Sequence, residues 1–382
     1  MSQSPDAIVI GAGIIGATTA LALTNAGLKT LVLDRGSIAS GTTSAGEGNI
    51  LVSDKEPGPE LDLALRSRDF WFELSDNIGG GFELEAKGGV VVTSSNSRGL
   101  QTLTAKQRRA GITVQDLTPT ELQALEPHLS PDITTGAYYP HDAQCQPMLA
   151  TARILKAVKA RGGEIITGAN VKVIQSVRGA VTSVETVDRS YSAPIVINAA
   201  GTWAGAIAKL AGAELPIAPR RGFILVSVPT PHRIFHKVYS AEYVANVASG
   251  DADLQSSAVV EGTQSGTILI GASRERVGFQ EGIDYSVVRI LARQAIELFP
   301  FLADVQLMRV YRGFRPYAPD HLPVIGQDPT IKGLWHNAGH EGAGIGLAPA
   351  SARLLTDMIL ERSSFMSGTP FDPARFSIAS AS

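Results

Sequence analysis

The hydrophobic positions at the start of the chain follow the order of a strand, a helix and a second strand. Ala7–Ile10 is a short uninterrupted apolar run, typical of a strand buried on both faces. The mostly small and apolar stretch from residue 14 to Ala26 predicts a helix, and Gly27 is well placed to end it. Leu31–Leu33 predicts the second strand, with Asp34 at its end. The start of the chain therefore predicts a βαβ unit.

Further along the chain the pattern changes and then returns. Strands and helices in the middle of the chain indicate a second domain, with an antiparallel sheet, that is inserted into the first. They are a helix around Leu61–Leu74, strands at Gly89–Thr93, Phe223–Val228 and Thr267–Gly271, and a helix at Val287–Leu302. The pattern of the first domain resumes in a helix-and-strand block from Met148 to Gln175, a strand at 195–201, and a tail of strand, Gly-rich turn and helix, the last from Ile345 to about Leu360.

Two domains are also the natural expectation for 382 residues. The fold class we predict is α/β, α+β overall, with a Rossmann-like dinucleotide-binding domain and an inserted antiparallel-sheet domain. The first domain would comprise residues 1–55, 143–212 and 312–382. The inserted domain would comprise residues 56–142 and 213–311 and would bind the substrate.

A glycine-rich loop connects the first strand to the first helix. Gly11 permits a tight turn, Gly13 lets the backbone approach a pyrophosphate, and Gly16 allows close packing of helix on strand. The helix N-terminus then offers N–H groups and a positive dipole end to phosphates. Asp34, 18 residues after Gly16, can accept hydrogen bonds from ribose hydroxyls. The alternative is an ordinary βα turn, with Asp34 as a solvated strand end.

Composition excludes several other functions. The single cysteine, Cys145, excludes an intramolecular disulfide and any cysteine-based zinc or iron–sulfur site in this chain, and we expect Cys145 to pack in the core. We expect no metal site. The net charge of -3 and the lack of a basic run argue against nucleic acid as a partner. No apolar stretch reaches ~18 residues, and no signal peptide is evident, so we expect a cytoplasmic protein without a membrane span.

Four stretches resemble one enzyme family when taken together. They are Thr42–Asn49, Asn198–Trp203, Arg315–Gly326 and Gly339–Gly346, in that order. They resemble the D-amino-acid oxidase/glycine oxidase/sarcosine oxidase superfamily, and the resemblance covers essentially the whole chain. Within it, the stretch Gly266–Glu275 most resembles the flavoprotein (beta) subunits of octopine and nopaline oxidases, hydrogen cyanide synthase and D-hydroxyproline dehydrogenase.

The resemblance implies that the first domain binds FAD. No cysteine lies near Arg315 and no histidine follows the first glycine loop at the usual attachment place, so the FAD would be noncovalent. The second glycine loop would present helix N–H groups to the N1–C2=O edge of the flavin. The cofactor-binding residues that we expect are Gly11, Gly13, Ile14, Ile15, Gly16, Asp34, Arg35, Thr42, Thr43, Ser44, Gly46, Gly48, Asn49, Val171, Ala200, Gly201, Trp203, Arg315, Gly339, His340, Glu341, Gly342, Gly344, Ile345 and Gly346.

Arg315 is the main candidate for substrate binding. In the amino-acid-oxidising relatives an arginine before a proline in this motif binds the substrate carboxylate, and a guanidinium can do so with two parallel hydrogen bonds. A structural salt bridge is the alternative. His340 and Glu341 suggest an acid–base pair, although packing beneath the flavin ring is the interpretation we favour. Tyr243 and Arg221 are weaker candidates, and Arg221 could equally be a surface charge.

The predicted reaction is oxidation of the C–N bond of a small amino acid or secondary amine: opine-like, proline-like or N-alkyl. A hydride would pass from Cα to flavin N5, and the imine product would hydrolyse. One alternative is an oxidase of glycine, sarcosine or a D-amino acid that uses O₂. Another is a noncatalytic FAD-holding subunit of a complex. Electrons could also pass to partner subunits that carry an acceptor.

Overall fold

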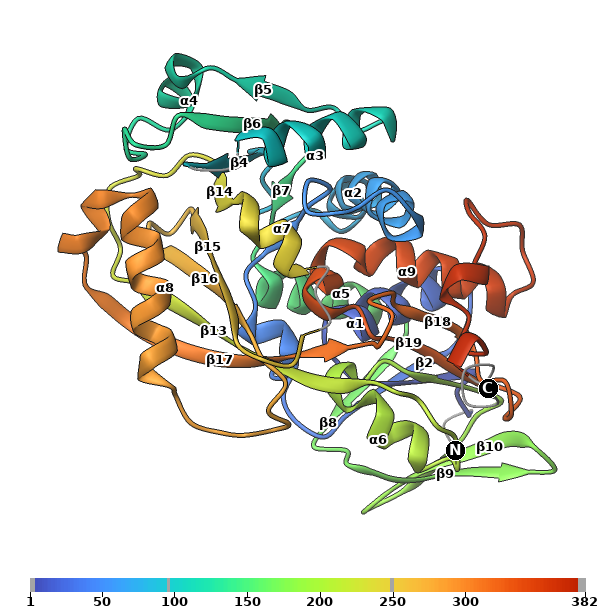
Figure 1. Cartoon of the computed structure of the whole chain (residues 1–382). Coiled ribbons are helices and arrows are strands. Elements are labelled where there is room, and N and C mark those ends of the chain that lie inside the picture. The colour runs from blue at the N-terminus through green and yellow to red at the C-terminus, as the bar shows by residue number, and fades with distance from the viewer. Residues whose placement is uncertain (1–3, 95–96, 248–250, 377–382) are drawn as a thin grey trace.

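The computed structural model describes residues 4–94, 97–247 and 251–376. One half of the molecule is built on a six-stranded sheet in the order β18-β19-β12-β1-β2-β8 (Figure 1). All neighbours in this sheet are parallel except β18 and β19. Its strands are β1 (Ala7–Ile10), β2 (Thr30–Asp34), β8 (Glu164–Thr167), β12 (Ile195–Asn198), β18 (Val324–Gln327) and β19 (Leu334–Ala338). The predicted βαβ unit is confirmed.

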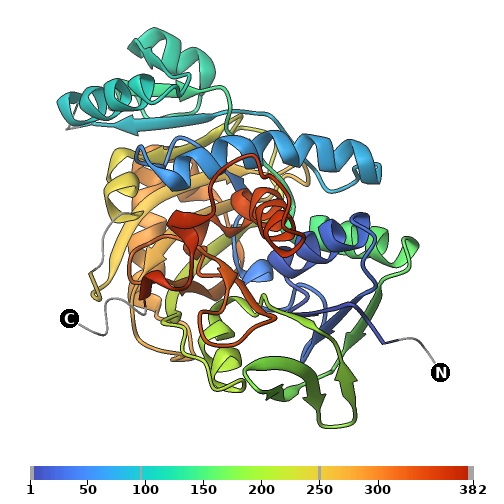
Figure 2. The same ribbon diagram turned by 90° about the vertical axis from the view of Figure 1, so that its right-hand side faces the viewer.

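Helices pack on this sheet through small side chains. α1 (Ile14–Asn25) packs against both α5 (Pro147–Ala160) and α9 (Gly344–Ile359), and α9 also packs against α2 (Pro59–Ile78). Figures 1 and 2 show α9 between α1 and α2. Gly16, Ala17 and Ala20 on α1 are buried, and their small size permits the close approach of helix and sheet. Cys145 is a free, buried thiol in the same core, as predicted.

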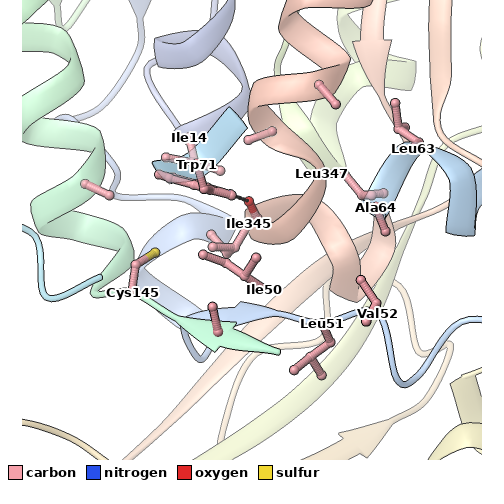
Figure 3. Packing of buried hydrophobic residues seen from close by; sticks show 14 of the residues in the cluster. Ile14, Ile50, Leu51, Val52, Leu63, Ala64, Trp71, Cys145, Ile345 and Leu347 are labelled. Carbon is pink, nitrogen blue, oxygen red and sulfur yellow. Dashed lines mark hydrogen bonds between the residues drawn. The ribbon is translucent and has the colours of Figure 1, made fainter. Parts of the chain in front are cut away.

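Pro349 lies inside α9, where proline has no N–H to donate to the carbonyl four residues earlier. That carbonyl belongs to Ile345, and it accepts a hydrogen bond of 2.9 Å from the indole Nε1 of buried Trp71 instead (Figure 3). Ser67 Oγ likewise donates to the Gly346 carbonyl at 2.6 Å. Side chains of α2 therefore brace the first turn of α9, the turn that follows the second glycine loop.

The second sheet has eight strands in the order β17-β13-β16-β15-β14-β4-β6-β5. Only β14 and β4 pair in parallel; the other described neighbours are antiparallel. α8 (Tyr285–Leu298) covers one face. The strands are β4 (Gly89–Thr93), β5 (Gln115–Leu117), β6 (Thr135–Tyr139), β13 (Ala218–Ser227), β14 (Lys237–Ser240), β15 (Gln255–Gly262), β16 (Ile268–Arg274) and β17 (Leu307–Tyr317). The predicted fold class is confirmed.

Several elements lie outside the sequence prediction. They are α3 (Ser97–Arg109), α4 (Pro119–Leu125), α6 (Ala204–Lys209), α7 (Ala241–Val247), the short strands β3 (Asn49–Ile50) and β7 (Ala143–Gln144), the strands β5, β6, β14, β15, β17 and β18 of the two large sheets, and β10 (Ala180–Thr186) and β11 (Ser190–Ser192) of a three-stranded sheet. The third strand of that small sheet, β9 (Val171–Val177), matches the end of the predicted helix-and-strand block. α8 ends at Leu298, before the predicted Leu302, because Pro300 disfavours a helical Phe299.

The domain division stays a prediction. Its boundary at residue 312 falls inside β17, which runs along the edge of the eight-stranded sheet. In the described ranges, no helix is both long and apolar enough to cross a membrane.

Candidate active site

A cavity of about 410 Å³ lies where the two sheets meet. Its walls come from the loops after β1, β2, β12 and β19 and from β13 and β17. The loops after β1, β2, β12 follow the carboxyl ends of parallel strands, where α/β sheets bind ligands. The fold therefore brings both glycine loops to one cavity.

The three glycines of the first loop have separate roles. A Cβ at Gly11, whose φ is +117°, would overlap the Ala199 carbonyl oxygen, and one at Gly16 would overlap the Gly11 carbonyl oxygen. Both glycines thus permit two backbone segments of the chain to pack closely against each other. A Cβ at Gly13 would meet only Thr43 Oγ1, at 3.0 Å, and Gly13 lines the cavity. Gly13 is the one of the three at which a side chain would project toward a ligand.

Asp34 braces the same loop. Its two carboxylate oxygens each accept one backbone N–H at 2.7 Å, from Ala12 and from Gly36. Asp34 lines the cavity and is only half-buried, so its remaining lone pairs are available to hydroxyl donors. This geometry agrees with the predicted ribose contact and gives the residue a structural role as well.

The hydroxyl groups of the 3₁₀ turn at Thr42–Ala45 form hydrogen bonds within the protein. Thr42 Oγ1 donates to the Phe314 carbonyl at 2.8 Å, and Ser44 Oγ donates to the Gly41 carbonyl at 3.0 Å. Thr43 Oγ1 accepts the Ile14 N–H at 3.0 Å. Of the three, Thr43 keeps its hydroxyl proton for a ligand, because here it acts as acceptor.

The second glycine loop ends in an open helix N-terminus. α9 begins at Gly344 with no side-chain cap and no acid in its first turn, and α1 has the same two features. Two uncapped N-termini therefore adjoin one cavity, and each offers N–H groups and a positive dipole end. Buried Asn337 Oδ1, also in the cavity wall, has no hydrogen-bond partner among the described residues.

Most of the predicted cofactor residues line this cavity: Gly11, Gly13, Ile14, Ile15, Asp34, Arg35, Thr42, Thr43, Gly46, Asn49, Val171, Ala200, Gly201, Trp203, Arg315, His340, Glu341, Gly342, Gly344 and Ile345. Five others lie behind the wall: Gly16, Ser44, Gly48, Gly339 and Gly346. A Cβ at Gly48 would overlap the Cys145 carbonyl oxygen, so this glycine serves chain packing.

Trp203 is half-buried in the cavity wall. Its ring stacks on Phe279 with centroids 5.7 Å apart, and the Arg35 guanidinium lies 4.3 Å from its centroid. The indole is thus part of a stack with Phe279 and Arg35 in the cavity wall and is not a residue of the buried core.

The side chain of Arg315 lies across the neighbouring strand of the second sheet. On β17 it pairs with Arg220 of β13, and its side chain lies over Gly222, where any Cβ would overlap the guanidinium. Nη1 donates to the Ser273 carbonyl at 2.8 Å. No carboxylate in the described part of the chain forms an ion pair with Arg315. Burial lowers its pKa to about 10, with Arg274 adding a second lowering effect. The predicted alternative, a structural salt bridge, therefore has no partner carboxylate among the described residues.

His340 is buried in the second glycine loop, where it lines the cavity. Its Nε2 lies 3.0 Å from Ser351 Oγ, and burial lowers its pKa to about 3. The imidazole is therefore neutral at pH 7 and a poor proton acceptor. Glu341, by contrast, forms an ion pair of 3.3 Å with Arg220, and its other carboxylate oxygen lies 2.9 Å from His321 Nδ1, so its main role is to balance Arg220.

A second cavity of about 270 Å³ adjoins the first. The two share five residues, namely Tyr243, Arg315, His340, Glu341 and Gly342. Its further ionisable residues are Asp54, Lys55, Glu56, Glu60, Arg220, Arg274 and His321. Arg315 thus lies at the border between a larger, loop-lined space and a smaller, charged one.

Arg220 and Arg274 were missed at the sequence level. Adjacent strand residues point to opposite faces, so only one of Arg220 and Arg221 can share a face with Arg315. The pairing of β13 with β17 selects Arg220. Arg221 is 5% exposed and paired with Glu275 at 2.8 Å, so the interpretation as a surface charge was wrong. The two adjacent arginines, Arg220 and Arg221, were the signal in the sequence that could have pointed to this part of the site.

A buried cluster of charged side chains around Lys237 adjoins the first cavity. Lys237 Nζ lies 2.7 Å from Glu261 and 3.4 Å from Glu47, and it also bonds Asn49. Burial opposes its charge, yet the two carboxylates outweigh burial and raise its pKa. Glu47 lines the cavity, and its Oε1 has no hydrogen-bond partner among the described residues.

The first cavity fits FAD by its donor set. One uncapped helix N-terminus with an open glycine suits a pyrophosphate, and the other suits the electron-rich edge of a flavin. Asp34, at the end of β2, lines the same cavity and is positioned for a ribose. When bound, FAD would be held by the loops after β1, β2, β12 and β19.

Comparisons with known proteins agree with this fit. Residues 6–358 match the family model described as DAO, FAD dependent oxidoreductase. The chain is 30% identical to a glycine oxidase of Pseudomonas aeruginosa over 97% of this chain and 99% of that protein. A crystal structure of glycine oxidase from Geobacillus kaustophilus superposes with a TM-score of 0.88 at 24% identity, covering 97% of this chain and 98% of the other. One of L-proline dehydrogenase from P. horikoshii gives 0.89 at 22% identity, covering 99% of each.

Proposed function

The chain belongs to the DAO family of FAD dependent oxidoreductases, and from this premise we propose that it oxidises the C–N bond of a small amino acid, with a secondary amine preferred. The observation that carries the proposal is Arg315, a half-buried guanidinium without an ion-pair partner among the described residues, at the border of the cofactor cavity. Relatives named glycine oxidase and L-proline dehydrogenase support an amine beside a carboxylate.

Arg315 would fix the substrate carboxylate. Nη1 is committed to the Ser273 carbonyl, which holds the guanidinium plane still, and the remaining donors are available to a carboxylate. The amine-bearing Cα would then lie toward the first cavity. Preorganising one charged contact in this way converts binding energy into orientation of the reacting carbon.

When bound, FAD would supply the acceptor for the hydride of the Cα–H bond. Loss of a hydride from a neutral secondary amine leaves an iminium ion, and addition of water then gives a keto acid and a protonated amine. His340 is neutral and bonded to Ser351, so we propose that the substrate amine binds deprotonated and needs no side-chain base. Tyr243 would pack against the substrate, since its buried ring belongs to both cavities.

Product analysis tests this proposal. The flavin-loaded protein should convert a secondary-amine amino acid, such as an opine, an N-methyl amino acid or a proline, into one keto acid or imine per two electrons delivered to an artificial dye. Dye reduction without a carbonyl or imine product would contradict C–N oxidation. A yellow protein that oxidises no amino acid would favour the noncatalytic, FAD-holding alternative, which the unpaired Arg315 argues against.

The electron acceptor gives a second prediction. The resemblance of Gly266–Glu275 to flavoprotein subunits of multi-chain dehydrogenases supports transfer to a partner chain. We expect slow turnover with O₂ and faster turnover with a dye, measured side by side at one substrate concentration. The similarity to a glycine oxidase supports the rival, an O₂-using oxidase. Rapid, stoichiometric peroxide from the isolated chain would decide for that rival.

A further inference from the structure

One oxygen of the Glu47 carboxylate is buried beside the first cavity without a hydrogen-bond donor. Glu47 is 7% exposed and lines that cavity. Its Oε2 accepts a hydrogen bond of 2.9 Å from Asn49 Nδ2 and lies 3.4 Å from Lys237 Nζ, whereas Oε1 has no partner among the described residues. A buried carboxylate oxygen without a donor is costly, so a site that keeps one is suited to a ligand that brings the donor.

Lys237 does not belong to Glu47 alone, because it also contacts a second carboxylate. Its Nζ lies nearer to Glu261, at 2.7 Å, than to Glu47. Glu261 is fully buried and does not line the cavity. Two carboxylates therefore share one ammonium group, and the carboxylate that reaches the cavity has the longer contact. Glu47 is thus available to balance a positive charge on a ligand.

Glu47 and Arg315 lie over neighbouring positions on one face of the second sheet. A Cβ at Gly222 of β13 would overlap the Arg315 guanidinium. A Cβ at Gly271 of β16 would lie 2.5 Å from Glu47 Oε1 and 3.0 Å from Ile224 Cδ1. Gly222 and Ile224 both line the cavity and are two residues apart on one strand, so they share a face at a spacing of roughly 7 Å. Glycine on both strands leaves room for the two charged side chains.

This spacing suits the two polar ends of one amino acid. The nitrogen of an amino acid is two bonds from its carboxyl carbon, and a hydrogen bond of about 3 Å at each end reaches both side chains. No ion pair joins Arg315 and Glu47 in the described part of the chain. Burial lowers the pKa of Arg315 most, and Glu47 is among the groups that raise it, so the two charges interact across the gap.

We propose that Glu47 is a catalytic residue that accepts a hydrogen bond from the substrate amine N–H and stabilises the positive charge that the nitrogen gains in the reaction. This inference rests on the proposed function and assigns the second polar end of its substrate. As the hydride leaves Cα for the bound FAD, the nitrogen lone pair forms the C=N bond and the N–H proton stays on nitrogen. The nitrogen changes from neutral to positive, so its contact with a carboxylate is stronger after this step than before it. Glu47 acts as an acceptor and removes no proton.

Two ligands that carry no hydrogen on the carbon beside the carboxylate test this preference for positive charge. 1-Methylpyridinium-2-carboxylate has a planar cationic nitrogen next to that carbon, and 2-methylbenzoate has the same shape with carbon in place of the nitrogen. The flavin-loaded wild-type protein should bind the pyridinium at least about tenfold more tightly, measured by the change in flavin absorbance on titration. Glu47→Gln should reduce the preference to less than about twofold.

Glu261→Gln is the matched control, because it removes the same charge from the same lysine without changing the cavity wall. It should lower Tm, since Glu261 is the nearer partner of Lys237, and it should keep the preference for the pyridinium. In kinetics, Glu47→Gln should slow anaerobic flavin reduction by roughly 10- to 100-fold with the proline, opine or N-methyl amino acid that the protein oxidises. The Kd of 2-methylbenzoate should change by less than about threefold.

Equal affinity of the wild-type protein for the two ligands would overturn the inference, and this comparison needs no variant to fold. Equal loss of the preference in Glu47→Gln and Glu261→Gln would also overturn it. A Glu47→Gln protein that keeps the preference but has a shifted flavin reduction potential would assign Glu47 to the cofactor instead. Oxidation of amino acids without a preference for the pyridinium would refute this inference alone. Selective binding of the pyridinium without oxidation of any amino acid would refute the proposed function and leave the charge contact of Glu47 in place.

Discussion

Arg315→Ala is expected to lower kcat/KM for an amino-acid substrate by roughly 30- to 1,000-fold. A charge-assisted contact in a partly dry pocket contributes about 2–4 kcal/mol, which includes the cost of leaving the carboxylate unpaired. Arg315→Lys should recover little, because an ammonium cannot reproduce the planar fork that bonds both Ser273 and a carboxylate. The measurement is steady-state kinetics with a dye acceptor on protein of known flavin content.

The control separates substrate binding from folding. Arg315 forms no ion pair with a carboxylate in the described part of the chain, so its removal should leave flavin content and Tm close to those of the wild type. Arg221→Ala, which breaks the buried pair with Glu275, should instead lower Tm, because it strands a buried carboxylate. If Arg315→Ala loses its flavin or unfolds as Arg221→Ala does, the residue is structural.

Gly13→Val is expected to give a protein that is almost free of FAD. Gly13 has ordinary extended backbone angles, with φ -79° and ψ -177°, so valine costs no unusual backbone conformation. The branched side chain would, however, project toward the cavity from beside Thr43 and occupy the place of the pyrophosphate. The absorbance ratio of flavin to protein after purification measures the effect, and activity should fall in proportion.

The matched control lies at the other end of the same helix. Gly27 has φ +93° and a Cβ there would meet nothing within 4 Å, so Gly27→Asn alters a glycine of the same βαβ unit without filling the cavity. It should bind FAD normally. A Gly13→Val protein with wild-type flavin content would show that the pyrophosphate lies elsewhere.

The sequence predicted the parts of the fold that depend on local pattern. The apolar runs of β1 and β2, the glycine loop between them and Asp34 follow from residue type and spacing alone, and so do α5 and α9. The pattern did not predict β10 and β11, because these short strands leave many of their residues exposed, such as Thr182 and Ser190.

The site was predicted unevenly for a physical reason. Arg315 was found because it stands in a motif, whereas Arg220 and Arg274 reach the cavity only through the pairing of β13 with β17 and β16. Because side chains alternate along a strand, Arg220 and Arg221 must point to opposite faces of the sheet. The register of β13 with β17, which depends on residues far apart in the sequence, decides which of them faces the cavity. The Glu47 oxygen that has no partner among the described residues is likewise a property of the folded chain.

Anaerobic mixing of the flavin-loaded protein with an amino-acid substrate, and separately with the amine that lacks its carboxylate, tests the central claim most directly. The readout is loss of the long-wavelength flavin absorbance. The account predicts that the amino acid bleaches the flavin, that the amine does so far more slowly, and that Arg315→Ala removes the difference. Equal bleaching by both compounds in the wild-type protein would contradict the claim that a carboxylate held by Arg315 directs the oxidation.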